Sequence, residues 1–385
     1  MSSALEVVFW LCCALIVWTQ LGYAAALALL ARLFARPRSG PGERLHPSQP
    51  LPSLSLIVAA HDEQQVIAAK VHNALALDYP RELLEVIVAC DGCRDDTASY
   101  ARQAGADLVL ELARGGKIRA QDAAVERSRG AIVAFSDANS LWEPDAARAL
   151  VSAFEDSHVG YACGQVRFVQ ADPDGESQEG VYWRYEMAVR ALESRLSSIT
   201  AGNGAIYATR RSSYIVVDPI MGHDLSFPFN IVKRGQHAVY VPQARATEKM
   251  VPSIAGEFQR KRRMMSHTWP IVLRGGMLSP RGYPPGYALM ILSHRILRYS
   301  SAGLHLLALA ANIALLASGG GFPYNLTLCL QGLLLLAAAL AGVIPFSLPR
   351  LARYYVLTTA SLAAGLWDWL RHGTQAVWDV SEGTR

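Results

Sequence analysis

The chain has 385 residues, a formal net charge of +4 and a hydrophobic content of 51%. This length is enough for one α/β domain with accessory segments, and so small a positive charge excludes nucleic acid as the expected partner. The mean hydropathy of +0.18 is high for a soluble enzyme and low for a pure membrane bundle. Because the apolar residues gather near the two ends, we expect membrane segments on either side of a polar domain.

The N-terminal segment, residues 1–35, is apolar over more than the length of a bilayer-spanning helix. Arginines cluster at its end, and no small-residue cleavage site is evident, so we expect an uncleaved transmembrane helix whose C-terminal end is cytoplasmic. Residues 36–52 are rich in Pro, Gly and Ser, which predicts a linker. The six cysteines lack the spacing of a disulfide framework or a zinc site, which suits a reduced, cytoplasmic domain.

The middle of the chain, residues 53–275, alternates between strand and helix patterns. Strands are predicted at 54–59, 84–89, 107–110, 131–135 and 205–208, and helices at 63–76, 95–104, 117–127, 181–196 and 256–265. This alternation predicts an α/β domain with a Rossmann-like, mostly parallel sheet. Ligands are then expected at the carboxyl ends of the strands.

Apolar segments return after Pro285. Residues 276–300 predict an amphipathic helix at the membrane interface, with Arg295 and Arg298 holding the domain against the bilayer. Within 301–372, residues 302–317 and 326–344 are transmembrane candidates, whereas 354–370 could span, re-enter or lie flat. Residues 373–385 form a tail. These features predict a multi-pass protein of the cell (inner) membrane with a cytoplasmic middle domain.

The segment Phe135-Ser-Asp-Ala-Asn139 places a carboxylate directly after a buried strand. Such a carboxylate can hold a divalent cation, which a diphosphate requires. A capped turn is the alternative interpretation of an isolated Asp-x-Asn. The cation site is favoured because Asp91, Lys117 and Asp224 also lie at element ends of the same domain.

Each of these companions also has a structural alternative. Asp91 can accept hydrogen bonds from a base or ribose, or close a tight turn. In His61-Asp62-Glu63, Asp62 is expected to cap a helix and Glu63 to contact a nucleotide. Gly115-Gly116-Lys117 lacks the complete G-x-x-x-x-G-K-[ST] pattern, which excludes a P-loop ATPase, but its glycines and lysine can hold an anion.

Two further segments complete the candidate site. Asp224 could take a proton from an attacking hydroxyl, or be a turn residue. Residues 260–263, Arg-Lys-Arg-Arg, could neutralise a leaving diphosphate or form a solvated basic face.

Taken in order, the segments AAHDE, DGCRDDT, GGK, FSDAN, VYWRYE, GNGAIYATRR, GHD and QRKRR resemble a family 2 glycosyltransferase with the GT-A fold, over residues 53–269. The resemblance implies an inverting enzyme that uses Mg²⁺ or Mn²⁺ and a nucleotide-sugar donor, with a UDP-sugar as our hypothesis. A lipid-linked or glycan acceptor would be presented at the lipid bilayer.

The resemblance also assigns roles to single residues. It implies nucleotide-sugar contacts at Ala59, His61, Glu63, Asp91, Lys117, Asp137 and Gln259. It implies metal ligands at Asp137 and Asn139, a catalytic base at Asp224, and stabilisation of the leaving group by Arg262 and Arg263.

Three positions depart from the family pattern. Asn139 replaces a second Asp, His223 replaces an acidic residue before the base, and Arg263 stands where a Trp associated with processive synthesis belongs. We therefore expect addition of one or a few sugars. The alternatives are a processive exopolysaccharide synthase and a catalytically inactive, membrane-anchored protein that binds or assembles glycans. A nucleotidyltransferase and a dehydrogenase are disfavoured because their glycine-rich loops are missing.

Overall fold

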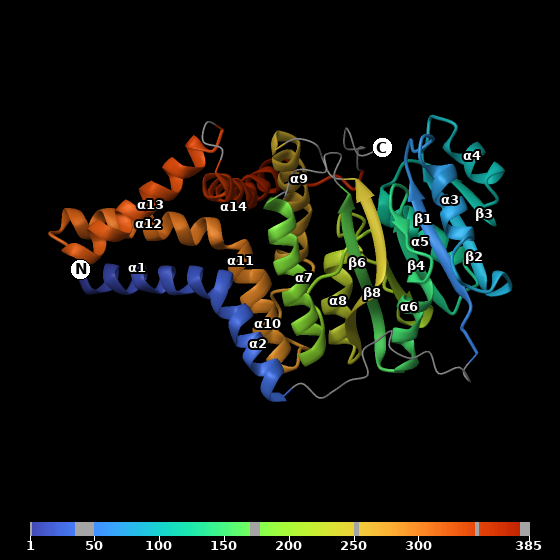
Figure 1. Ribbon diagram of the computed structural model, residues 1–385, viewed down its shortest axis with the longest axis horizontal. Coiled ribbons are helices and arrows are strands. Elements are labelled where there is room, and N and C mark those ends of the chain that lie inside the picture. Colours follow the sequence, from blue (N-terminus) through green and yellow to red (C-terminus); the bar gives the residue numbers. More distant parts are fainter. Residues whose placement is uncertain (1, 35–49, 170–177, 250–253, 343–345, 378–385) are drawn as a thin grey trace.

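The computed structural model of the chain describes residues 2–34, 50–169, 178–249, 254–342 and 346–377. It is elongated, with a sheet and its covering helices at one end and a group of apolar helices at the other (Figure 1). Most of the expected linker and the end of the expected tail lie outside the described residues.

One sheet organises the domain. Its strands are β1 (Leu54–Ala60), β2 (Leu84–Asp91), β3 (Leu108–Leu112), β4 (Ile132–Asp137), β5 (Leu141–Trp142), β6 (Val159–Val169), β7 (Tyr207–Arg210) and β8 (His237–Lys249). They lie in the order β3-β2-β1-β4-β7-β6-β8-β5. Within the described residues, β7 and β5 pair antiparallel with their neighbours and the remaining pairs are parallel. The predicted α/β class is confirmed, with a sheet that is mixed on one side of β4.

Helices cover both faces of the sheet. They are α3 (Ile67–Leu75), α4 (Thr97–Gln103), α5 (Lys117–Arg127), α6 (Ala146–Ser152), α7 (Gln178–Leu196), α8 (His223–Lys233) and α9 (Ile254–Leu273). Short 3₁₀ turns lie at Arg81–Leu83, Ala153–Glu155 and Arg211–Ser213. The helix expected from Glu63 begins later, because the amides of Val66 and Ile67 first donate to the Glu63 carbonyl in a turn.

The strand β1 explains why the sheet forms where it does. Every residue of β1 is buried, as the continuous apolar run predicted. Leu56 packs in a core that includes α6, whereas Ile57 packs on the opposite face beside residues of α5 and α8. This alternation is the period of a strand that is buried on both sides.

The apolar helices are α1 (Ser2–Val17), α2 (Tyr23–Phe34), α10 (Pro285–Met290), α11 (Leu297–Tyr299), α12 (Ser301–Ala317), α13 (Phe322–Leu340) and α14 (Ser347–His372). The π-helical turns η1 (Trp18–Gly22) and η5 (Ile291–Ile296) join α1 to α2 and α10 to α11. In Figure 1, α1 runs beside α12, whereas α2 turns towards the sheet domain and packs against α7.

Two helices among the described residues are long and apolar enough to cross a membrane, Ser3–Phe34 and Phe322–Leu340. A third span results if Pro285–Tyr299 and Ser301–Ala317, which meet at a bend of 64°, act together. The last helix, α14, is not among these candidates and packs closely on α9. A Cβ on Gly365 would lie 2.9 Å from the Arg262 carbonyl oxygen, and Trp269 Nε1 donates to the Leu362 carbonyl at 3.0 Å.

Candidate active site

The carboxyl ends of β1, β2 and β4 meet at one edge of the sheet. Asp137 is the last residue of β4 and lies opposite Ala59 of β1, and Asp91 is the last residue of β2. Chain order reverses at β1, because β2 and β3 lie on one side of it and β4 on the other. A crevice for ligands is expected at such a switch point.

Lys117 connects this edge to the other predicted residues. Its ammonium forms an ion pair with the Asp137 carboxylate. Burial alone would lower the pKa of Lys117, but the carboxylates of Asp137, Asp224 and Glu248 raise it above the ordinary value. The sequence prediction that Asp137, Lys117 and Asp224 lie together is therefore matched by their electrostatic coupling.

Asp91 holds the glycine loop that precedes Lys117. Its Oδ1 accepts the amide hydrogen of Gly115 at 2.6 Å, and its Oδ2 accepts that of Gly116 at 3.0 Å. Gly116 has φ +100°, a conformation that L side chains rarely adopt. The carboxylate of Asp91 thus fixes the backbone from which Lys117 projects, and its predicted contact with a nucleoside remains a prediction.

His61 and Glu63 extend the site beyond β1. His61 Nδ1 lies 2.7 Å from the Asp91 carbonyl oxygen, which accepts a hydrogen bond when Nδ1 is protonated. The Glu63 amide donates to Thr97 Oγ1 at 2.8 Å. Ala59, His61, Glu63 and Asp91 are all buried and lie around two adjacent strand ends, and their contacts with a nucleoside stay a prediction.

The segment Gly202-Asn-Gly204 forms the opposite wall. A Cβ on Gly204 would lie 3.2 Å from Lys117 Nζ and 3.7 Å from Asp137 Oδ2. Gly204 therefore brings backbone against the ion pair. The Gly202 amide donates to the Asp224 carbonyl at 2.6 Å, which ties this segment to the predicted base.

Asp224 is half-buried in the first turn of α8. Burial raises the pKa of its carboxyl, and Lys117 opposes that rise. A carboxylate whose pKa is raised in this way accepts a proton more readily than an exposed one. The neighbouring His223 points elsewhere: it is buried against Phe227 and Tyr207, and burial lowers its pKa to about 3, so it is neutral.

Two charged residues that the sequence analysis missed lie behind the ion pair. Lys70 of α3 is fully buried, donates to the Ser140 carbonyl at 2.7 Å, and has its pKa lowered by burial to about 7. Glu248 of β8 has its pKa raised by burial and by Asp137 to about 7. The sequence signal for Lys70 is a lysine on the apolar face of α3, whereas Glu248 is the penultimate residue of β8, a strand that was not predicted.

Oxygen-bearing side chains of the kind that bind divalent cations lie near this ion pair, and the predicted cation site at Asp137 and Asn139 stays a prediction. The carboxylates of Asp137, Asp224 and Glu248 all raise the pKa of Lys117. Glu248 Oε1 is buried without a hydrogen-bond partner among the described residues. Asn139 is half-buried two residues beyond Asp137, in a turn where the Ser140 amide donates to the Asp137 carbonyl at 3.2 Å. Carboxylate and amide oxygens are the ligands that Mg²⁺ and Mn²⁺ take.

The basic helix α9 divides its arginines between two directions. Arg262 binds Asp368 of α14 through two hydrogen bonds of 2.6 Å, and is therefore turned towards α14. Burial raises the pKa of Glu248, and the positive charge of Arg260 opposes that rise. Burial lowers the pKa of His267; the charge of Arg263 lowers it further, and the charge of Asp224 opposes this. Positions 260, 263 and 267 share one helix face. Gln259, on the same helix, is exposed.

Comparisons with known proteins agree with this fold. The model of a family described as "Glycosyltransferase like family 2" matches residues 52–266. An N-acetylglucosaminyltransferase from Rhizobium meliloti (strain 1021) is 29% identical over 238 residues, covering 55% of each chain. A beta-monoglucosyldiacylglycerol synthase from Trichormus variabilis is 31% identical over 182 residues. That alignment covers 45% of this chain and 37% of the synthase.

Among solved structures, the mannosyltransferase PcManGT from Pyrobaculum calidifontis, in complex with GDP-Man and Mn²⁺, superposes with a TM-score of 0.71. It is 23% identical in sequence, and the alignment covers 95% of this chain and 99% of that one. This likeness establishes the shared fold. The chain spans about half the length of the curated relatives that it matches first. Because the family model covers more than half of the chain, the protein belongs to the family 2-like glycosyltransferases.

Proposed function

We propose that this protein is an inverting glycosyltransferase that moves a sugar from a nucleotide-sugar donor to a membrane-associated acceptor. The observation that carries the proposal is the meeting of Lys117, Asp137 and Asp224 at the switch point of the sheet. A donor diphosphate needs positive charge, and an acceptor hydroxyl needs a base. This site offers both.

The roles follow from the charges at the site. When bound, Mg²⁺ or Mn²⁺ would be held by Asp137 with Asn139 and would supply charge that neutralises the diphosphate. Asp224 takes the proton from the acceptor hydroxyl, whose oxygen forms the new bond to the anomeric carbon. The bond from that carbon to the diphosphate oxygen breaks on the opposite face, which inverts the configuration. Lys117 and Arg263 stabilise the departing negative charge.

The names of the relatives support a hexose or N-acetylhexosamine as the transferred sugar, and one of them supports a lipid acceptor. The apolar helices support placement at a membrane, and the arginines at the end of the N-terminal apolar segment support a cytoplasmic sheet domain. Arg263 in the position of the processivity-associated Trp supports a short product. We take a UDP-sugar as the donor.

Mass spectrometry of the products tests this proposal. The purified full chain is incubated with Mn²⁺, lipid extract and, one at a time, UDP-hexoses, UDP-N-acetylhexosamines and GDP-mannose. We expect one UDP-sugar to give a lipid product heavier by one or a few sugar residues. GDP-mannose alone giving product would contradict the UDP assignment. Absence of turnover with the whole panel would support the alternative of an inactive, glycan-binding protein.

A further inference from the structure

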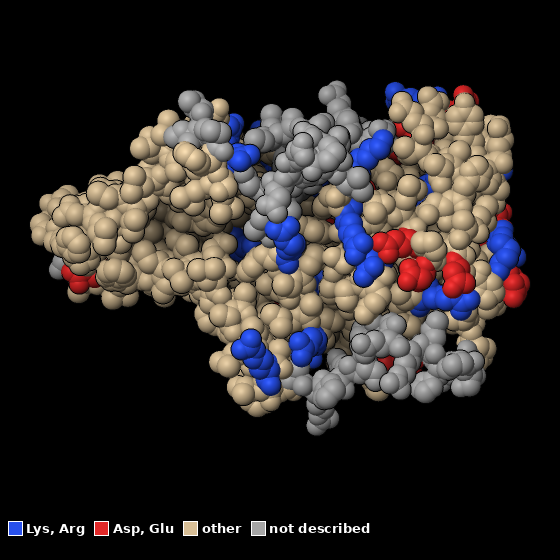
Figure 2. All heavy atoms as spheres, viewed as in Figure 1, with Lys and Arg blue, Asp and Glu red and all other residues tan. Residues whose placement is uncertain are grey.

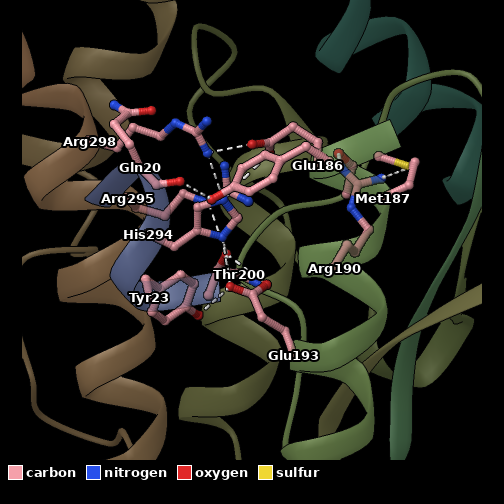
Figure 3. Close-up of polar contacts among 12 residues, drawn as sticks. Gln20, Tyr23, Glu186, Met187, Arg190, Glu193, Thr200, His294, Arg295 and Arg298 are labelled. Carbon is pink, nitrogen blue, oxygen red and sulfur yellow. Dashed lines mark hydrogen bonds and ion pairs between the residues drawn. The ribbon is translucent and has the colours of Figure 1, made fainter. Parts of the chain in front are cut away.

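A buried polar network, distinct from the residues proposed to touch the donor, joins the membrane-side helices to the sheet domain (Figure 3). Its charged members are Glu186, Arg190 and Glu193 from α7, and His294, Arg295 and Arg298 from the segment η5–α11. Each of these residues is buried. The sequence predicts that Arg295 and Arg298 hold the domain against the bilayer, but both side chains are buried inside the protein.

Around His294, the charged side chains of the network form pairs of opposite sign. Arg298 pairs with Glu186, and Arg298 Nη1 also lies 3.1 Å from His294 Nε2. His294 Nδ1 lies 2.7 Å from Glu193 Oε1. The His294 ring therefore joins Arg298 and Glu186, on its Nε2 side, to Glu193, on its Nδ1 side. The membrane-side helix α2 joins through the Tyr23 hydroxyl, which donates to Glu193 Oε1 at 2.7 Å.

Three charged residues of the network form hydrogen bonds with the segment 200–204. Glu193 Oε2 accepts the amide hydrogen of Thr200 at 3.0 Å, and Arg295 Nε donates to Thr200 Oγ1 at 2.8 Å. Arg190 Nη2 donates to the Gly202 carbonyl at 2.9 Å. Two of these bonds involve backbone groups, so the network fixes the path of the chain at this segment.

The same segment borders the candidate active site. The Gly202 amide donates to the Asp224 carbonyl, and Gly204 lies against the ion pair of Lys117 and Asp137. A continuous series of contacts therefore runs from η5 and α2, through Glu193 and Thr200, to the predicted base. These contacts can fix the position of Asp224 only if the groups that make them are held rigidly. Buried, charged hydrogen bonds hold them in this way.

We infer that Arg190, Glu193 and Arg295 are positioning residues, which fix segment 200–204, and through it Asp224, against the helices that lead towards the membrane. The inference rests on the proposed function, because it assigns Asp224 a catalytic role. It predicts that a loosened network misplaces the base while leaving the donor contacts on β1 and β2 in place.

Thr200 offers an isosteric test. Thr200→Val removes the hydroxyl that Arg295 uses, and Thr200→Ser keeps it. We expect Thr200→Val to lower kcat by roughly 10- to 100-fold, the scale of an ångström-sized misplacement. Its Kd for UDP in the presence of Mn²⁺ should stay within about twofold of wild type, because donor contacts are retained. Thr200→Ser should restore most of kcat.

Glu186→Gln is the matched control, because Glu186 contacts Arg298 and His294 on the side of the network away from segment 200–204. We expect it to lower thermal stability while leaving kcat per folded molecule near wild type. A loss of kcat equal to that of Thr200→Val would overturn the inference. So would unchanged kcat in Thr200→Val.

Hydrogen exchange supplies a readout that does not depend on sugar transfer. In Thr200→Val, the amides of 200–204 should exchange faster than in wild type, while those of β1 should not change. Equal protection of 200–204 in both proteins would contradict the positioning role. Absence of turnover in the wild-type protein would instead contradict the proposed function, so the two failures are distinguishable.

Discussion

Gly116→Ala probes the loop that carries Lys117. Gly116 has φ +100° and ψ 159°, a region that is essentially reserved for glycine. A Cβ would also overlap the carbonyl oxygen of Ala376 and lie 2.8 Å from its carbonyl carbon. The substitution therefore brings backbone strain and a clash with the segment that follows α14.

Strain of this kind costs about 1–3 kcal/mol. With a central value of about 2 kcal/mol, Tm should fall by about 4–8 °C for a domain of this size. The shift also disturbs the amide that Asp91 binds, so transfer should fall with stability. Thermal unfolding of the detergent-solubilised full chain, followed by near-UV circular dichroism, measures the change.

Two further variants separate the effects of backbone strain and of the clash with Ala376 on stability. Gly115 does not have a positive φ, and its added Cβ would lie 3.0 Å from Cδ of the flexible Arg119 side chain. Gly115→Ala should therefore change stability by about 0.5 kcal/mol or less. Truncation after His372 in the Gly116→Ala background removes the clash but retains the strain. A Gly116→Ala protein with the Tm of wild type would refute the reasoning.

Three other predictions concern charge and product. Asp137→Ala should abolish transfer and leave Tm near wild type, and near-normal turnover of the purified variant would remove Asp137 from the metal site. Lys70→Met should flatten the pH dependence of stability between about pH 7 and 10.5. In that window the unfolded chain binds the proton that burial expels from Lys70, so wild-type stability rises with pH; denaturant titrations at several pH values measure both slopes. With excess donor, the product should remain short, and a high-molecular-weight ladder from this chain alone would show that Arg263 does not limit processivity.

Much of the domain can be predicted from the order of apolar and polar residues in the sequence. The runs that form β1 and β2 are mostly apolar and almost entirely buried, because parallel central strands are covered on both faces. Helix α5 was predicted with the bounds Lys117–Arg127 that the structure has. The carboxylates Asp91 and Asp137 could be placed at one edge because strand ends are marked by the change from apolar to polar residues.

Other features depend on contacts between distant segments. The direction in which Arg262 points is set by Asp368, 106 residues further on, and sequence periodicity on α9 alone does not reveal that partner. The long strands β6 and β8 mix polar and apolar residues, since their burial varies along their length, so the strand that presents Glu248 was missed. Lys70 stands out as a lysine on the apolar face of α3, but its proximity to Asp137 and Glu248 depends on contacts between segments that are distant in the sequence.

The most direct test of the account is the turnover of donor bound to Asp224→Asn. The amide preserves shape but cannot take a proton, so kcat should fall about 10²-fold or more, the scale of general-base catalysis. Binding of UDP with Mn²⁺ should remain close to wild type. If instead donor affinity collapses and bound donor turns over at the wild-type rate, Asp224 binds donor, and the base must lie elsewhere.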